Sequence, residues 1–207
     1  MKDFNLATFI VGILSLAGVT ANIIVTAINN RKKRYTDLVT QRRLHTFQHI
    51  IDCSSNCIKS LYGVMTEGGN ANLLVQQFIE NKSQIFYNTN YKAPAEKELR
   101  DALDALQDLL VGYVENKENL TKAQKEKIFQ TMKCGAEYYQ AISAVYCKCE
   151  WVRIKKTALS VKDDMDTEKE YFERIKDVEK TVSENKKILF ENTFEKITAK
   201  KDKQIKK

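Results

Sequence analysis

The chain begins with a long stretch that contains no charged side chain. From Phe4 to Ile28 it runs for 25 positions without Asp, Glu, Lys or Arg. As a helix rising about 1.5 Å per residue, this stretch is longer than the roughly 30 Å hydrocarbon core of a bilayer. The pattern predicts a transmembrane helix, so we assign residues 1–30 to a membrane anchor. The alternatives are a signal peptide cleaved near residues 25–27 and a buried helix of a soluble core.

Polar and small side chains recur within this stretch at a helical spacing. The series is Asn5, Thr8, Gly12, Ser15, Val19, Asn22 and Thr26. Its steps of three and four residues keep it on one face of a helix, which we call the polar stripe. Because a single helix cannot hide this stripe from lipid, the pattern predicts a homo-oligomer. Two interpretations stay open: the stripe is a seam for helix packing, or several copies turn it inward to line a water-filled pore.

A basic segment follows the apolar stretch directly. We call it the basic collar, and its members are Arg31, Lys32, Lys33, Arg34, Arg42 and Arg43. The N-terminal flank has only Lys2 beside Asp3. By the positive-inside rule, the residues from 29 onward then face the cytosol. We expect a single-pass protein with a cytosolic C-terminal domain and a collar that contacts anionic membrane lipids.

The rest of the chain repeats apolar residues at spacings of three and four, as amphipathic helices do. A capping box formed by Thr121 and Gln124 marks one helix start, and Pro94 suits the first position of another. The spacing predicts helices over residues 35–65, 72–87, 94–113 and 121–159, and a last helix that starts near the acidic residues 163–166 and ends at the tail from residue 200. The pattern therefore indicates a bundle of long helices joined by short connections.

The composition agrees with a helical chain. The 207 residues include 1 Pro and 7 Gly, fewer turn-forming residues than sheet proteins with many tight turns require. The expected fold is all-α, with one N-terminal transmembrane helix followed by a cytosolic bundle of about four to five long helices. The bundle covers residues 31–199, and residues 200–207 form a basic, disordered tail.

The net charge of +7 comes from two short segments. Residues 29–60 carry +5 and the tail 200–207 carries +4, so the bundle between them is slightly acidic. This distribution indicates membrane topology, and we expect no direct DNA binding.

Catalytic and metal-binding patterns are sparse. The chain has 2 His, no Gly-rich phosphate loop and no nucleophile motif, so we expect neither enzyme activity nor a cofactor. His45, His49, Cys53 and Cys57 recur every four residues, but one straight helix cannot wrap four ligands around an ion. We expect no metal site there. The 5 Cys form no disulfide pattern and are typical of a reducing compartment.

One segment of the fourth predicted helix alternates aromatic and basic side chains. Its candidate anion-binding residues are Tyr146, Lys148, Trp151, Arg153, Lys155 and Lys156. Aromatic faces beside cations suit a small nucleotide or a short single strand. The alternative is that the aromatic rings belong to the core and the cations to a solvated face.

The segment 34–47, RYTDLVTQRRLHTF, comes directly after a single predicted span. In this arrangement it resembles the juxtamembrane segment of small bacterial membrane-anchored helical proteins, among them the effector of the Hailong anti-phage system. The resemblance covers residues 4–47 by pattern and the remainder by helix content, and no ligand residue carries over. It implies a channel in the bacterial cytoplasmic (inner) membrane, controlled by a nucleotide signal that a partner nucleotidyltransferase makes.

The expected function is that of a homo-oligomeric gated pore or membrane-disrupting effector in anti-phage defence. A signal sensed by the bundle would switch it, either a nucleotide second messenger or a partner protein. The alternative is a membrane-tethered adaptor whose bundle binds a protein partner and whose polar stripe serves only helix packing.

Overall fold

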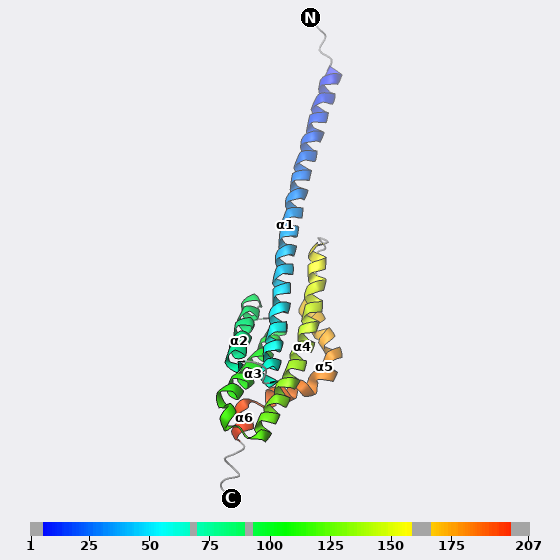
Figure 1. Ribbon diagram of the computed structural model, residues 1–207. Coiled ribbons are helices and arrows are strands. Elements are labelled where there is room, and N and C mark those ends of the chain that lie inside the picture. Colours follow the sequence, from blue (N-terminus) through cyan, green and yellow to red (C-terminus); the bar gives the residue numbers. More distant parts are fainter. Residues whose placement is uncertain (1–5, 67–69, 90–92, 159–166, 200–207) are drawn as a thin grey trace.

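The computed structural model describes residues 6–66, 70–89, 93–158 and 167–199. The side chains of residues 6–21, and of a few residues near 157, 168 and 180, lie outside this description. The helices are α1 (Leu6–Met65), α2 (Ala71–Asn88), α3 (Pro94–Asn116), the 3-10 turn η1 (Lys117–Asn119), α4 (Lys122–Ala158), α5 (Thr167–Glu191) and α6 (Phe194–Thr198). No strand occurs in the described ranges, which confirms the all-α prediction (Figure 1).

Helix α1 dominates the shape of the molecule. Its 60 residues extend for about 90 Å at 1.5 Å per residue. The C-terminal half lies within the bundle, whereas residues 6–38 project from it as a stalk (Figure 1). The sequence predicted a helix over 35–65, and the structure extends it without a break to Leu6.

The transmembrane part of the expected fold is not supported by the described residues. Where side chains are described, no helix combines the length and the hydropathy of a membrane span. Most of the predicted span, residues 4–21, lies outside those side chains.

The bundle packs five long helical segments around one core. The C-terminal half of α1 contacts α2 and α4, while α3 contacts α2, α4 and α5. The chain direction of α4 is opposite to that of α1, so the end of α4 returns toward the stalk (Figure 1). Each of the five segments contributes buried side chains to this core, among them Leu61, Phe78, Leu103, Tyr139 and Tyr171.

The helix starts follow the predicted signals. Thr121 and Gln124 form the capping box: the Thr121 amide donates to Gln124 Oε1 at 2.9 Å, and the Gln124 amide donates to Thr121 Oγ1 at 3.3 Å. Pro94 occupies the first turn of α3, where its missing amide proton costs nothing. Asn70 caps α2 by accepting from the amides of Asn72 and Leu73.

The sequence predicted one last helix that runs on to the tail at residue 200, but the structure divides it: α5 ends at Glu191 and the short helix α6 begins at Phe194. A five-residue helix is too short to show a repeating apolar pattern. Tertiary contacts stabilise α6 instead: Ile197 is 4% exposed, and Phe194 packs directly against Gly112 of α3. The tail 200–207 lies outside the described residues.

Candidate functional site

A cavity of about 410 Å³ lies at the base of the stalk, between α1 and α4. Its lining residues are Val39, Arg42, Arg43, Thr46, Phe47 and Ile50 from α1, Asn88 from α2, Glu96 from α3, and Tyr146, Glu150 and Arg153 from α4. The volume is within the range of pockets that hold small molecules. We call it the stalk-base cavity.

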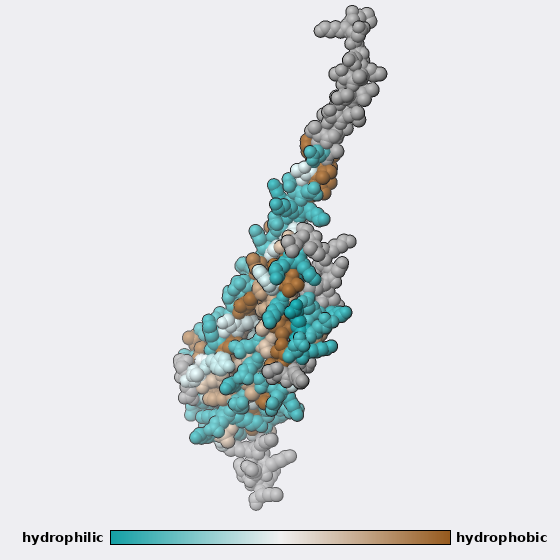
Figure 2. Space-filling model, turned by 90° about the vertical axis from the view of Figure 1, so that its right-hand side faces the viewer, coloured by the Kyte–Doolittle hydropathy of each residue, from teal (hydrophilic) through white to brown (hydrophobic). Residues whose placement is uncertain are grey.

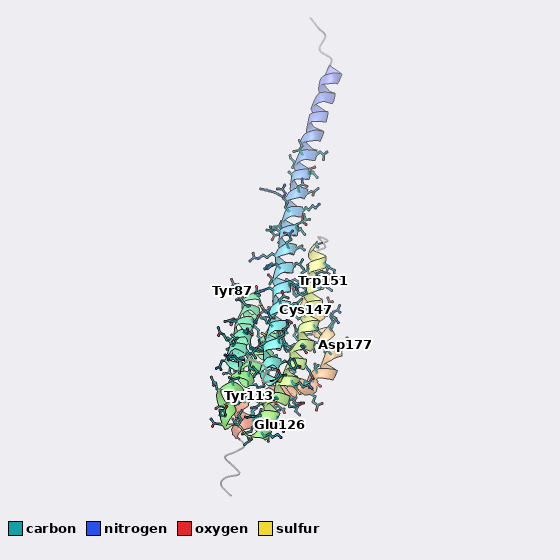
Figure 3. The ribbon with its side chains drawn as sticks, viewed as in Figure 1. Tyr87, Tyr113, Glu126, Cys147, Trp151 and Asp177 are labelled. Atoms are coloured by element: carbon teal, nitrogen blue, oxygen red, sulfur yellow. The ribbon has the colours of Figure 1, made fainter. Side chains whose placement is uncertain are left out.

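Helical spacing explains why these residues meet. On α1 the lining positions recur every three or four residues from Val39 to Ile50, and on α4 they recur from Tyr146 to Arg153, so each helix presents one face. Phe47 and Trp151 join the two helices, with ring centroids 6.2 Å apart and planes 23° apart. Trp151 lies at the stalk side of the bundle (Figure 3). An aromatic contact therefore holds α1 beside α4 next to the cavity.

The cavity is lined by charges of both signs. Three arginines face two glutamates, which leaves an excess of one positive charge. Arg153 donates to Glu150 at 3.4 Å, and the Tyr146 hydroxyl donates to Glu96 Oε1 at 3.0 Å. Burial, with the nearby charges of Glu96 and Glu150, raises the pKa of Tyr146 far above its usual range. Tyr146 is therefore a neutral hydrogen-bond donor to Glu96 at every physiological pH.

The predicted anion-binding residues are only partly brought together. Tyr146 and Arg153 line the cavity, and Trp151 adjoins it through Phe47. The Lys155 ammonium lies 5.8 Å from the Trp151 ring centroid, a cation–π distance. The side chains of Lys148 and Lys156 do not line the cavity: Lys148 is exposed and Lys156 is half-buried.

The basic collar divides into two groups. Arg31, Lys32, Lys33 and Arg34 are exposed on the stalk. Arg42, which is also exposed, and Arg43, which is half-buried, line the cavity 4 to 8 positions before Phe47 and Ile50. The sequence pattern predicts one membrane-surface element of six residues, whereas in the structure two of the six, Arg42 and Arg43, line the stalk-base cavity.

The polar stripe is described only at its C-terminal end. Asn22 and Thr26 are exposed on the stalk. Asn5 lies outside the described residues, as do the side chains of Thr8, Gly12, Ser15 and Val19. Beside Asn22, a hydrophobic patch of Ile23, Ile24, Val25 and Ile28 is exposed, and the hydrophilic collar follows it (Figure 2).

Sequence reasoning missed the acidic side of the cavity. Glu96 follows Pro94 in the first turn of α3, and only the tertiary fold brings it to α1 and α4. Glu150 lies among the predicted cations of α4. It is four residues after Tyr146 and three before Arg153, and this helical spacing could have placed it on the same face as the predicted anion-binding residues. Phe47 is four residues after Arg43 and therefore shares its helix face.

A second charged cluster lies on the other side of the α3 N-terminus. Glu98 Oε1 accepts from the Tyr138 hydroxyl at 2.5 Å and from the Lys186 ammonium at 2.6 Å, while Oε2 accepts from the Tyr171 hydroxyl at 3.3 Å. Burial raises the pKa of the Glu98 carboxyl, but these hydrogen bonds outweigh it and the pKa lies below its ordinary value. We call this cluster the Glu98 hub, and it ties α5 to α3 and α4.

Burial shifts the cysteine thiols toward their neutral form. Burial raises the pKa of the Cys57 thiol to about 12, and it also raises the pKa of Cys53, Cys134 and Cys149. His49 lies 3.8 Å from Cys53 Sγ and 3.5 Å from Gln84 Oε1. Across the described side chains, no three His, Cys, Asp or Glu residues are grouped as metal ligands.

No protein-family model, curated protein or solved structure matches this chain.

Proposed function

We propose that this chain is a homo-oligomeric, membrane-anchored effector that acts as a gated pore or disrupts the membrane, with the stalk-base cavity as the place where its signal is received. The observation that carries the proposal is the continuity of α1. One helix contains both the positions of the polar stripe from Thr8 to Thr26 and six of the residues that line the cavity.

A continuous helix couples these two regions mechanically. The stretch from Thr26 to Phe47 covers about 30 Å at 1.5 Å per residue. It contains neither Pro nor Gly, the residues at which helices most often kink. A shift or rotation of α1 at the cavity therefore moves the stripe as well, because the backbone between them has no hinge.

The charge of the stalk agrees with a position at an anionic inner leaflet. Four consecutive cations, Arg31 to Arg34, are exposed directly after the hydrophobic patch. Interfacial cations of this kind gain about 1 kcal/mol each from acidic lipids. The defence role rests only on the resemblance, which covers residues 4–47 by pattern, and the pore rests on the stripe.

The experiment is conductance of the full chain reconstituted into planar bilayers that contain phosphatidylglycerol. We expect Asn22→Leu to abolish or strongly reduce the current, because it removes a polar group from the stripe. Ile24→Leu is the matched control, since it alters an apolar residue off the stripe and is expected to leave the current unchanged. Equal currents from wild type and Asn22→Leu would contradict the pore and favour a stripe used only for packing.

A further inference from the structure

We propose that the stalk-base cavity binds a small organic monoanion, a carboxylate with an apolar body, in preference to a phosphate ester of higher charge. The role of this ligand as a signal, and the choice of a soluble acid over a lipid headgroup, rest on the proposed function, whereas the binding itself does not.

The cationic groups of the cavity supply the anion recognition. Arg42 and Arg43 come from α1, and Arg153 approaches from α4. Guanidinium groups present paired N–H donors that match the two oxygens of a carboxylate. Arg42 has neither a salt bridge nor a hydrogen bond to another described residue, so its donors can meet a ligand without breaking a bond within the described part of the chain.

The acidic groups of the cavity limit the charge of the ligand. Glu96 and Glu150 reduce the three positive charges of the lining to a net excess of one. A carboxylate neutralises this excess. An anion of two or more charges would place its surplus beside these two carboxylates, and like charges at close range cost several kcal/mol.

The apolar groups of the cavity define the body of the ligand. Val39, Phe47 and Ile50 supply aliphatic and aromatic surface, and the Tyr146 hydroxyl is already bonded to Glu96. A cavity of about 150 Å³ is enough to hold benzene, so 410 Å³ accommodates an aryl or short alkyl group together with a carboxylate.

With the proposed membrane anchor, the position of the cavity argues against a lipid headgroup as the source of the anion. Arg42 comes 14 residues after Ile28, the last residue of the predicted span, which is about 21 Å along the helix. The headgroup region of one leaflet is only about 5–8 Å thick. A helix perpendicular to the bilayer therefore holds the cavity beyond the headgroups, where a soluble acid reaches it.

Trp151 provides the assay, because it is the only Trp in the chain and it stacks on the cavity residue Phe47. The full chain in detergent micelles is titrated with phenylacetate, phenyl phosphate and benzyl alcohol at pH 8 while Trp151 emission is recorded. Each probe contains one phenyl ring. Phenylacetate carries one negative charge, phenyl phosphate carries about two, and benzyl alcohol carries none. We expect a saturable change with phenylacetate, and at least fivefold weaker binding of the other two.

Three variants make the assignment specific. Arg42→Ala is expected to weaken phenylacetate binding about tenfold, whereas Arg34→Ala, an exposed arginine of the same helix, leaves it unchanged. Glu150→Gln raises the charge of the lining by one and is expected to improve phenyl phosphate binding relative to phenylacetate.

Several results would overturn the proposal. These are equal binding of benzyl alcohol, tighter binding of phenyl phosphate by the wild type, equal loss in Arg34→Ala and Arg42→Ala, or no saturable response to any probe. None of these results depends on conductance, so a failure of this inference and a failure of the pore are told apart.

Discussion

Removal of the Glu98 carboxylate is the sharpest test of how the bundle is held together. The variant Glu98→Ala removes the Glu98 acceptor from the hydroxyls of Tyr138 and Tyr171, whose side chains are 2% and 1% exposed. A buried donor that loses its partner costs about 1–3 kcal/mol. Lys186 is 40% exposed, so water compensates its ammonium and it adds less than about 1 kcal/mol. We expect a loss of about 3 kcal/mol in the free energy of unfolding.

The assay is urea unfolding of the full chain in mild detergent, followed by circular dichroism. Glu98→Gln retains one carbonyl acceptor and is expected to lose less stability than Glu98→Ala. Glu115→Ala, which removes an exposed acid from the same helix, changes stability by less than about 0.5 kcal/mol. If Glu98→Ala and Glu115→Ala destabilise the chain equally, the reasoning about the Glu98 hub is wrong.

The pH dependence of the Glu98 hub has a definite sign. The pKa of Glu98 in the folded chain lies below its ordinary value of 4.5, so the unfolded chain holds the proton more tightly. The stabilisation is complete above the unfolded pKa and is lost as the pH falls through the folded pKa. The stability difference between wild type and Glu98→Gln therefore shrinks below about pH 4.5, and a constant difference down to pH 3 would contradict the assignment.

Two further predictions concern packing and thiol chemistry. Gly112→Ala places a Cβ 2.5 Å from Phe194 Cγ, so the ring must move and the contact that holds α6 weakens. We expect a loss of about 1 kcal/mol in the free energy of unfolding, measured by urea unfolding. In a chain that already contains Phe194→Ala, the added Gly112→Ala substitution should cost much less, because no ring is left to displace. Cys57 is buried, and its pKa of about 12 keeps it a thiol. Iodoacetamide at pH 8 should modify it only after unfolding, as measured by mass spectrometry, and rapid labelling of the folded chain would refute its burial.

The long helices were predictable because their signals are local. Apolar residues repeated over four or more turns predicted α3 and α4, and the capping box at Thr121 placed the start of α4 within one residue. The short helix α6 has no such repeat. Its formation depends on the contact of Phe194 with Gly112, which joins residues 82 positions apart and leaves no local pattern.

The cavity was predictable only in part for the same reason. Tyr146 and Arg153 were found because aromatic and basic residues alternate on one helix. The sequence predicts a membrane-surface position for Arg42 and Arg43, because it does not reveal that α4 returns beside them. Glu96 comes from a third helix, and nothing in its local sequence connects it to either group.

The central claim is that α1 transmits a change at the cavity to the polar stripe, and a helix break between them tests it most directly. Thr36→Pro interrupts α1 outside both regions at a cost of about 3 kcal/mol in helix stability, and Thr36→Ala is its control. The measurement is the factor by which Arg42→Ala changes bilayer current in each background. The account predicts that Arg42→Ala changes the current in the wild-type and Thr36→Ala backgrounds and leaves it unchanged in the Thr36→Pro background. The same factor in all three backgrounds, or no change of current in any of them, would contradict the account.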